Sequence, residues 1–272
     1  MWPGGNMAEF IGRVLIIAGS DSGGGAGIQA DIKTITALGG YAATAITAIT
    51  VQNTLGVSAV HPIPVDIVEA QARAVLDDIG ADVIKTGMLG TSELVNSVSE
   101  LLANYPDIPL VLDPVMVATS GDTLVDEGAV AAIRDRLLPR AALITPNAPE
   151  TEKLTGLPVT TTQEQAEAGR KLVEMGAAAA LIKGGHLSGS TITDVLVTAD
   201  MTMVFETERQ ETRNTHGTGC TLASAIATSL AKGSSLPDSI EAGGNYLSEA
   251  IRRAPGFGSG HGPVHHGWVA DR

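Results

Sequence analysis

The chain has 272 residues, which is long enough to bury a large hydrophobic core, and 44% of them are hydrophobic, which fits a globular protein and argues against disorder. Aromatic residues make up only 3%, so the core must be built mainly from Ala, Val, Ile and Leu. The 17 basic and 30 acidic residues give a formal net charge of −13, which argues against nucleic acid or an anionic membrane as a partner.

Strands and helices are predicted to alternate along the chain. Residues 1–12 are predicted to form a flexible tail, and a strand at 14–18, a glycine-rich loop at 19–27 and a helix at about 28–38 follow it. Further strands are predicted at 41–51, 57–61, 83–85, 110–112, 142–144, 180–182, 194–198 and 202–206. Further helices are predicted at about 65–79, 91–103, 126–138, 163–175, 218–231 and 237–252. Apolar strands between amphipathic helices indicate an α/β fold with a mostly parallel sheet covered on both faces, and the lack of any linker predicts one domain over 13–272.

The sequence shows no signal for export or membrane insertion. Its first residues, MWPGGNMAEFIGR, contain no basic region followed by about 7–15 apolar residues. No apolar run approaches the roughly 20 residues of a membrane span. The single cysteine excludes an intrachain disulfide and suits a reducing compartment, so we expect a cytoplasmic protein.

Glycines and polar residues follow the predicted strands at their carboxyl ends. Ligands of open α/β sheets bind at this edge, so these residues should meet although they are distant in sequence. They are Gly19, Asp21, Gln52, Lys85 to Met88, Asp113, Asn147 and Lys183 to His186.

The loop at 19–27, GSDSGGGAG, lies between a strand and a helix. Such loops often hold phosphate, but no Lys follows at the spacing of a P-loop, and a tight turn that lets the helix pack closely explains the glycines equally well. Asp31, one turn into the helix, either accepts a hydrogen bond from a ligand hydroxyl or is an ordinary solvated helix residue.

Two strand ends carry acidic residues that suit a hard cation. Asp113 precedes a proline, and Glu150 follows Asn147 by three residues. These residues either form a turn and a helix cap or position Mg²⁺ through water molecules. Lys183 precedes two glycines and either supplies a charge to phosphate or reaches solvent, and His186 is assigned no role.

The segment 214–227, NTHGTGCTLASAIA, places Gly217, Thr218 and Gly219 at the start of a helix. Backbone N–H groups there form an anion site that needs no charged side chain, which suits a chain of net charge −13. Cys220 is either a small buried residue or a reactive thiol whose pKa the helix start lowers. The histidines at 261, 265 and 266 have irregular spacing and no carboxylate nearby, so we expect a surface tail there.

Seven segments in this order resemble the hydroxymethylpyrimidine/phosphomethylpyrimidine kinases of thiamine biosynthesis, in the ribokinase-like superfamily. They are AGSDSGGGAGIQADIKT, AITVQNTLGV, KTGML, VLDPVMVATSGDTL, LITPNAPE, LIKGGH and NTHGTGCTLASAIA, and the resemblance covers about residues 13–266. It implies a three-layer α/β/α sandwich, usually as a homodimer. It also implies phosphorylation of 4-amino-5-hydroxymethyl-2-methylpyrimidine and then of its monophosphate, with ATP and Mg²⁺.

The resemblance also implies roles for individual residues. Gly19, Asp31, Gln52, Met88 and Val115 match the pyrimidine pocket. Asp113, Asn147, Glu150, Lys183 and Thr215 match the Mg-ATP side, with Asp113 and Glu150 near the metal. Gly217, Thr218 and Gly219 match the anion hole, and Cys220 stands where ribokinase has its Asp base.

Alternatives to this reading remain open. Relatives with GTGC also phosphorylate vitamin B6, so a pyridoxal or pyridoxine kinase is the second hypothesis. A pyrimidine sensor without catalysis would show damaged ATP elements, and none is seen in the sequence. Cys220 acts either as a proton acceptor or as a covalent nucleophile, and residues 20–27 and 118–123 are hypothesised to be flaps over the site.

Overall fold

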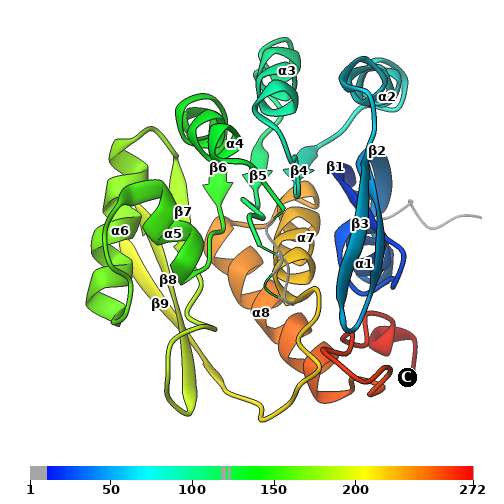
Figure 1. The fold of residues 1–272 in the computed structure, drawn as a ribbon. Helices are drawn as coiled ribbons and strands as arrows, with labels where there is room; N and C mark the ends of the chain where they lie inside the picture. Colours follow the sequence, from blue (N-terminus) through cyan, green and yellow to red (C-terminus); the bar gives the residue numbers. More distant parts are fainter. Residues whose placement is uncertain (1–10, 118–120, 122–123, 272) are drawn as a thin grey trace, which may run out of the picture.

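A sheet of nine strands runs through the part of the chain that the computed structural model describes, residues 11–117, 121 and 124–271 (Figure 1). The strands are β1 (Arg13–Asp21), β2 (Tyr41–Asn53), β3 (Gly56–Pro62), β4 (Val83–Thr86), β5 (Leu110–Leu112), β6 (Ala141–Ile144), β7 (Ala179–Ile182), β8 (Thr191–Thr198) and β9 (Thr202–Glu208). Their order is β3-β2-β1-β4-β5-β6-β7-β8-β9, parallel from β2 to β7. β3 joins one edge antiparallel, and the β8–β9 hairpin joins the other.

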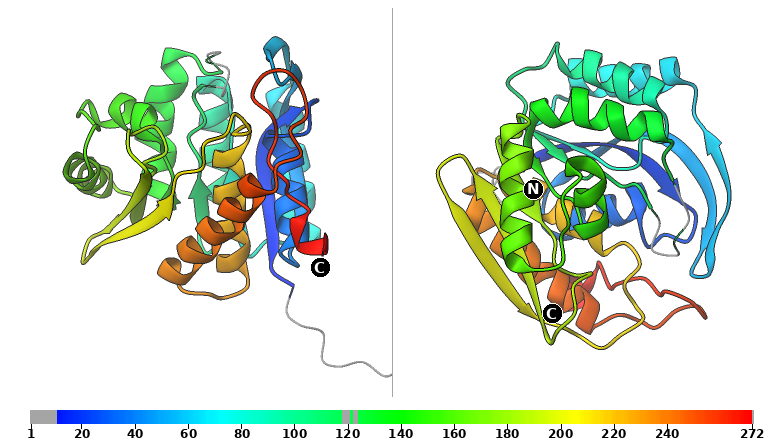
Figure 2. Two further views of the ribbon diagram at one scale, coloured as in Figure 1. Left: turned by 90° about the horizontal axis from the view of Figure 1, so that it is seen from below. Right: turned by 60° about the vertical axis from the view of Figure 1, so that its left-hand side comes forward.

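Helices cover both faces of the sheet, which makes the predicted three layers (Figure 2). α1 (Gly27–Ala37), α7 (Thr218–Ala231) and α8 (Leu236–Arg252) lie on one face. The other face carries α2 (Val65–Asp78), α3 (Ser92–Leu102), α4 (Glu127–Ala132), α5 (Ala148–Thr155) and α6 (Thr162–Glu174). No helix among these described residues is both long and apolar enough to cross a membrane.

The residues of β1 show why its sequence is continuously apolar. Leu15 and Ile17 belong to the core under α2 and α3, whereas Val14 and Ile16 belong to the core under α1 and α7. Side chains alternate between the two faces of a strand, so a strand buried on both faces needs apolar residues at every position.

The structure corrects two expectations about elements. β1 continues past residue 18 to Asp21, because β2 runs on beside it and pairs with Ser20 and Asp21. The predicted helix at 126–138 is α-helical only as α4, and a π turn (Ile133–Leu137) and a 3₁₀ turn (Leu138–Arg140) follow.

The C-terminal segment, predicted to be a surface tail, packs into the fold instead. Gly262, Val264 and His266 are buried. The His216 amide donates to the Gly262 carbonyl at 3.1 Å, and the His261 amide donates to the Thr54 carbonyl at 2.8 Å. The predicted tail at 1–12 and the flap at 118–123 fall largely outside the described residues, and the division into a tail and one domain stays a prediction.

Candidate active site

A cavity of about 600 Å³ opens at the carboxyl ends of β1 and of β4 to β7. The sheet order reverses between β1 and β4, which is where open α/β sheets bind their ligands. All but one of the residues predicted to act line it: Gly19, Gln52, Met88, Asp113, Val115, Asn147, Glu150, Lys183, Thr215, Gly217, Thr218, Gly219 and Cys220.

One side of the cavity combines apolar side chains with a single amide. A Cβ atom at Gly19 would lie 2.7 Å from the Met88 side chain, so a larger residue would displace this wall. Thr50 Oγ1 lies 3.0 Å from Gln52 Oε1 and 3.0 Å from the Ser20 carbonyl, which restrains the Gln52 side chain. This side suits a flat ring with polar atoms on one edge.

Asp31 is the residue that does not line the cavity. Its side chain is fully buried and accepts hydrogen bonds from Lys85 Nζ at 3.0 and 3.1 Å and from Ser224 Oγ at 2.7 Å. The expected contact with a ligand hydroxyl is therefore replaced by an internal ion pair. Burial raises the pKa of Asp31, with Lys85 opposing the rise. Lys85 was not assigned a role from the sequence, although a lysine inside an apolar strand is a signal in itself.

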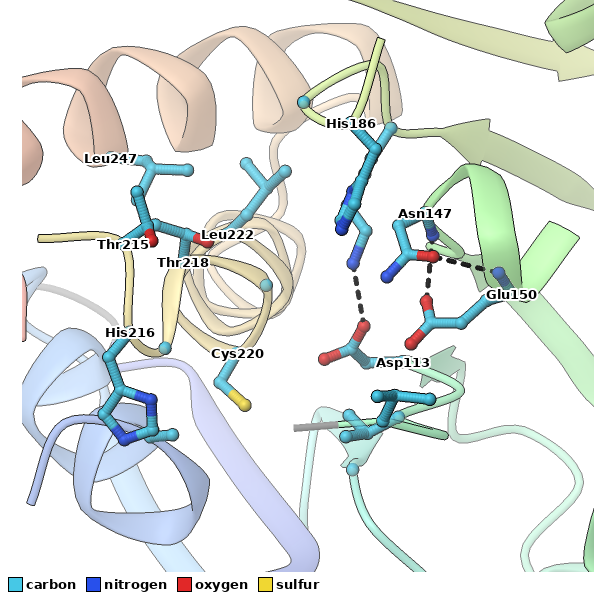
Figure 3. Close-up of a pocket in the computed structure, with 18 of the residues that line it drawn as sticks. Asp113, Asn147, Glu150, His186, Thr215, His216, Thr218, Cys220, Leu222 and Leu247 are labelled. Carbon is cyan, nitrogen blue, oxygen red and sulfur yellow. Dashed lines mark hydrogen bonds and ion pairs between the residues drawn. The ribbon is translucent and has the colours of Figure 1, made fainter. Parts of the chain in front are cut away.

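The opposite side of the cavity is charged (Figure 3). Lys183 Nζ lies 3.2 Å from Asp113 Oδ1. Glu150 and Asn147 form a capping box at the start of α5, with each side chain accepting from the other residue's amide at 2.9 Å. The helix-cap reading of these residues is thus correct, and both residues line the cavity as well.

The charges on this side perturb one another. Burial raises the pKa of Glu150 to about 7, and Lys183 opposes the rise while Asp113 adds to it. Burial disfavours the ammonium of Lys183, but Asp113 and Glu150 outweigh it and raise its pKa. Burial, Lys183 and Arg209 lower the pKa of His186, which also lines the cavity.

The donor set suits a magnesium ion that arrives with a nucleotide. Asp113 Oδ2 is buried and has no hydrogen-bond partner in the described structure. Within the ranges described, no group of three or more His, Cys, Asp or Glu is placed to hold a metal. Mg²⁺ keeps several water ligands and commonly binds through one or two carboxylates plus phosphate oxygens, so Asp113 and Glu150 fit this ion.

The start of α7 forms the third side. Gly217 has φ 81° and precedes the helix without a side-chain cap. A Cβ atom at Gly219 would lie 3.2 Å from Lys183 Nζ, so the lysine ammonium faces the first turn. The unpaired N–H groups of a helix start and an ammonium together make an anion site.

Cys220 lines the cavity in the first turn of α7 and is half-buried. Burial raises the pKa of its thiol to about 12, with Lys85 opposing and Asp31 and Asp113 adding to the rise. The expectation that the helix start lowers this pKa is therefore wrong, because burial disfavours the thiolate and the nearby carboxylates of Asp31 and Asp113 add to this effect.

Two cavity residues that sequence reasoning did not assign are Asp21 and His216. His216 Nε2 lies 2.8 Å from Asp21 Oδ2, and both side chains are buried. Their separation of 195 positions leaves no local signal.

The family model for phosphomethylpyrimidine kinase matches residues 21–265. The chain belongs to this family. It is 48% identical over 256 residues to a hydroxymethylpyrimidine/phosphomethylpyrimidine kinase of Streptomyces coelicolor, covering 94% of each chain. It is 49% identical over 255 residues to the thiamine biosynthesis bifunctional protein ThiED of Geobacter sulfurreducens, where it spans 52% of that longer protein and 94% of its own length.

Solved structures of kinases for two kinds of substrate share the fold of this chain. A Bacillus subtilis pyridoxal kinase in complex with ADP has a TM-score of 0.89 at 34% identity, with 97% of this chain and 100% of that chain covered. A phosphomethylpyrimidine kinase from Clostridium difficile has a TM-score of 0.79 at 39% identity, with 88% and 99% covered. The fold is thus the predicted ribokinase-like sandwich, shared by kinases for both kinds of substrate.

Proposed function

We propose that this protein transfers a phosphoryl group from ATP to 4-amino-5-hydroxymethyl-2-methylpyrimidine, and then a second one to the monophosphate. The observation that carries the proposal is one cavity with an apolar side bearing a single amide and an anion-binding side at the start of α7. The family and the curated relative from Streptomyces coelicolor support the same activity.

The apolar side would hold the pyrimidine. Met88 and Val115 would enclose the ring, and the Gln52 amide offers both a donor and an acceptor to its amino edge. Gly19 keeps this side open, because any side chain there would meet Met88. The hydroxymethyl group would then face Cys220 and the start of α7.

The charged side would hold the triphosphate. The backbone N–H groups of Gly217, Thr218 and Gly219 and the ammonium of Lys183 would stabilise the charge that develops on the transferring phosphoryl group. Asn147 and Thr215 would contact the nucleotide from the cavity wall. Mg²⁺, held by Asp113 and Glu150 with the phosphates, would neutralise charge on the phosphate oxygens.

Cys220 would receive the proton of the hydroxymethyl group. The substrate oxygen bonds to the γ-phosphorus, ADP leaves, and the hydroxyl proton passes to the Cys220 thiolate. A pKa of about 12 makes this thiolate a strong but rarely populated base. Phosphoryl transfer has a loose transition state that depends mainly on positioning and charge stabilisation, so a rarely ionised base is compatible with turnover.

The test is product analysis. The protein is incubated with ATP, Mg²⁺ and hydroxymethylpyrimidine, and products are followed by mass. We expect the monophosphate first and the diphosphate later, with turnover lost in Cys220→Ala. Partial activity in Cys220→Asp supports a base, whereas no activity in that variant supports a covalent thiol.

Pyridoxal or pyridoxine phosphorylation is the second candidate, favoured by the fold shared with the Bacillus subtilis pyridoxal kinase. A side-by-side comparison of kcat/KM for the pyrimidine and for pyridoxal decides between the two. The higher identity to the curated pyrimidine kinase, 48% against 34%, favours the pyrimidine. A homodimer and a cytoplasmic location stay predictions from the sequence.

A further inference from the structure

Two glycine-containing turns from distant parts of the chain are in direct contact beside the cavity. One follows β1 at residues 22–26, and the other precedes α7 at residues 215–217. A Cβ atom at Gly217 would lie 1.8 Å from the Gly25 carbonyl oxygen, and a Cβ atom at Gly25 would lie 2.4 Å from the His216 ring. The first turn borders the pyrimidine side, and the second carries the anion hole.

Asp21 organises the first turn. Its Oδ1 accepts from the Gly23 amide at 2.7 Å, and its Oδ2 accepts from the amides of Gly25 at 3.0 Å and Ala26 at 2.8 Å. The same Oδ2 meets His216 Nε2 at 2.8 Å. Burial would raise the pKa of Asp21, but His216 and the backbone donors lower it. The carboxylate is therefore an acceptor only, and Nε2 of His216 must carry the proton.

The second turn is held from its other side by the C-terminal segment. The amide of His216 donates to the Gly262 carbonyl at 3.1 Å. The carbonyl of Gly217 accepts from Thr221 Oγ1 at 2.8 Å, and that hydroxyl lies 3.0 Å from His266 Nε2. In the view of Figure 3, His216 and Asp113 lie on opposite sides of Cys220. The His216 ring thus lies away from the Asp113 side of the cavity, and its contact with Asp21 joins the two turns.

We propose that His216 is a positioning residue for phosphoryl transfer. Its Nε2–H hydrogen bond to Asp21 fixes the start of α7 against the turn after β1. The distance between the anion hole and the pyrimidine side of the cavity is thereby held constant. The inference rests on the proposed kinase function, because both turns are assigned through it. A displacement of about 1 Å between reacting groups costs on the order of a hundredfold in rate, so this bond should act on kcat more than on KM.

The chain allows a matched pair of variants. In H216Q the amide nitrogen is as many bonds from Cα as Nε2 of histidine, so it still reaches Asp21. In H216N the amide is one carbon shorter and does not reach. H261Q is the control, since His261 is exposed on the same C-terminal segment and does not line the cavity.

We expect H216N to lower kcat by about 10- to 100-fold, with KM for the acceptor changed by less than about threefold. H216Q and H261Q should stay within about threefold of the unmodified protein. D21N should lower kcat at least as much as H216N, because it also weakens the bonds that Asp21 accepts from the amides of the first turn. D21N/H216N should be no worse than D21N alone, because the bond that H216N removes is already lost in D21N. Equal loss in H216Q and H216N, a loss confined to KM, or multiplied losses in the double variant would overturn the proposal.

Hydrogen exchange separates this inference from the kinase assignment, because it needs no turnover. In H216N, but not in H216Q, the amides of 23–26 and of 216–221 should exchange faster together. Faster exchange in 216–221 alone would refute the link between the turns. Failure to phosphorylate either the pyrimidine or pyridoxal would refute the kinase assignment and leave the exchange result to decide the role of His216.

Discussion

The ionisation of Cys220 gives the sharpest prediction. Its thiol pKa of about 12 leaves about one thiol in ten thousand ionised at pH 8, whereas about a quarter of ordinary thiols of pKa about 8.5 are ionised there. Ionisation alone therefore slows alkylation by about three orders of magnitude. A thiolate of higher pKa is intrinsically more nucleophilic, by about 30-fold for this difference if alkylation follows the dependence known for thiol exchange. We expect Cys220 to react about a hundredfold more slowly than a free thiol.

The assay is clean because the chain has one cysteine. Iodoacetamide labelling of the ligand-free protein is followed by mass from pH 6 to pH 10. The rate should rise tenfold per pH unit with no plateau. In D31N the rate at a given pH should be higher, because the Asp31 charge raises the pKa of this thiol.

A plateau below pH 9 would refute the reasoning from burial and show that the helix start dominates. Catalysis should depend on pH in the same direction as alkylation. The thiolate is the deprotonated form, so kcat should rise with pH until the protein unfolds if Cys220 is the base. A flat profile with an ionisable Cys220 would mean that proton removal does not limit turnover.

Three substitutions test other parts of the structure. Gly217→Ala should destabilise the protein more than Gly233→Ala in urea unfolding. Both glycines have a positive φ, which costs an alanine roughly 1–2 kcal/mol, but only the new methyl group at position 217 would also meet a backbone carbonyl. Equal losses of stability would contradict the packing of the two turns. Lys85→Met should lower the free energy of unfolding by about 3–5 kcal/mol, because it leaves Asp31 buried without its ion-pair partner. The double variant Asp31→Asn/Lys85→Met should recover much of this stability. A double variant as unstable as Lys85→Met would argue against a role for the ion pair in stability. Lys183→Met should lower kcat by at least about tenfold with the fold intact by circular dichroism, and unchanged kcat would remove Lys183 from the phosphate site.

Local patterns in the sequence determined the layers and the rim of the site. Apolar runs such as residues 14–18 and the helical period after them depend on neighbours within a few positions, so the α/β class and the strand ends were predictable. The order of the motifs identified the family, and with it 13 of the 14 residues expected at the cavity, because parallel strands bring their carboxyl ends to one edge.

The tertiary structure alone decided which charges are buried together. Asp31 pairs with Lys85 across 54 positions, and Asp21 pairs with His216 across 195, so neither contact has a local signal. The pKa of Cys220 is raised by burial and by carboxylates from other elements, whereas its own sequence, at a helix start, predicts a lowered pKa. Contact and desolvation depend on how the elements pack, and no pattern within a single element contains that information.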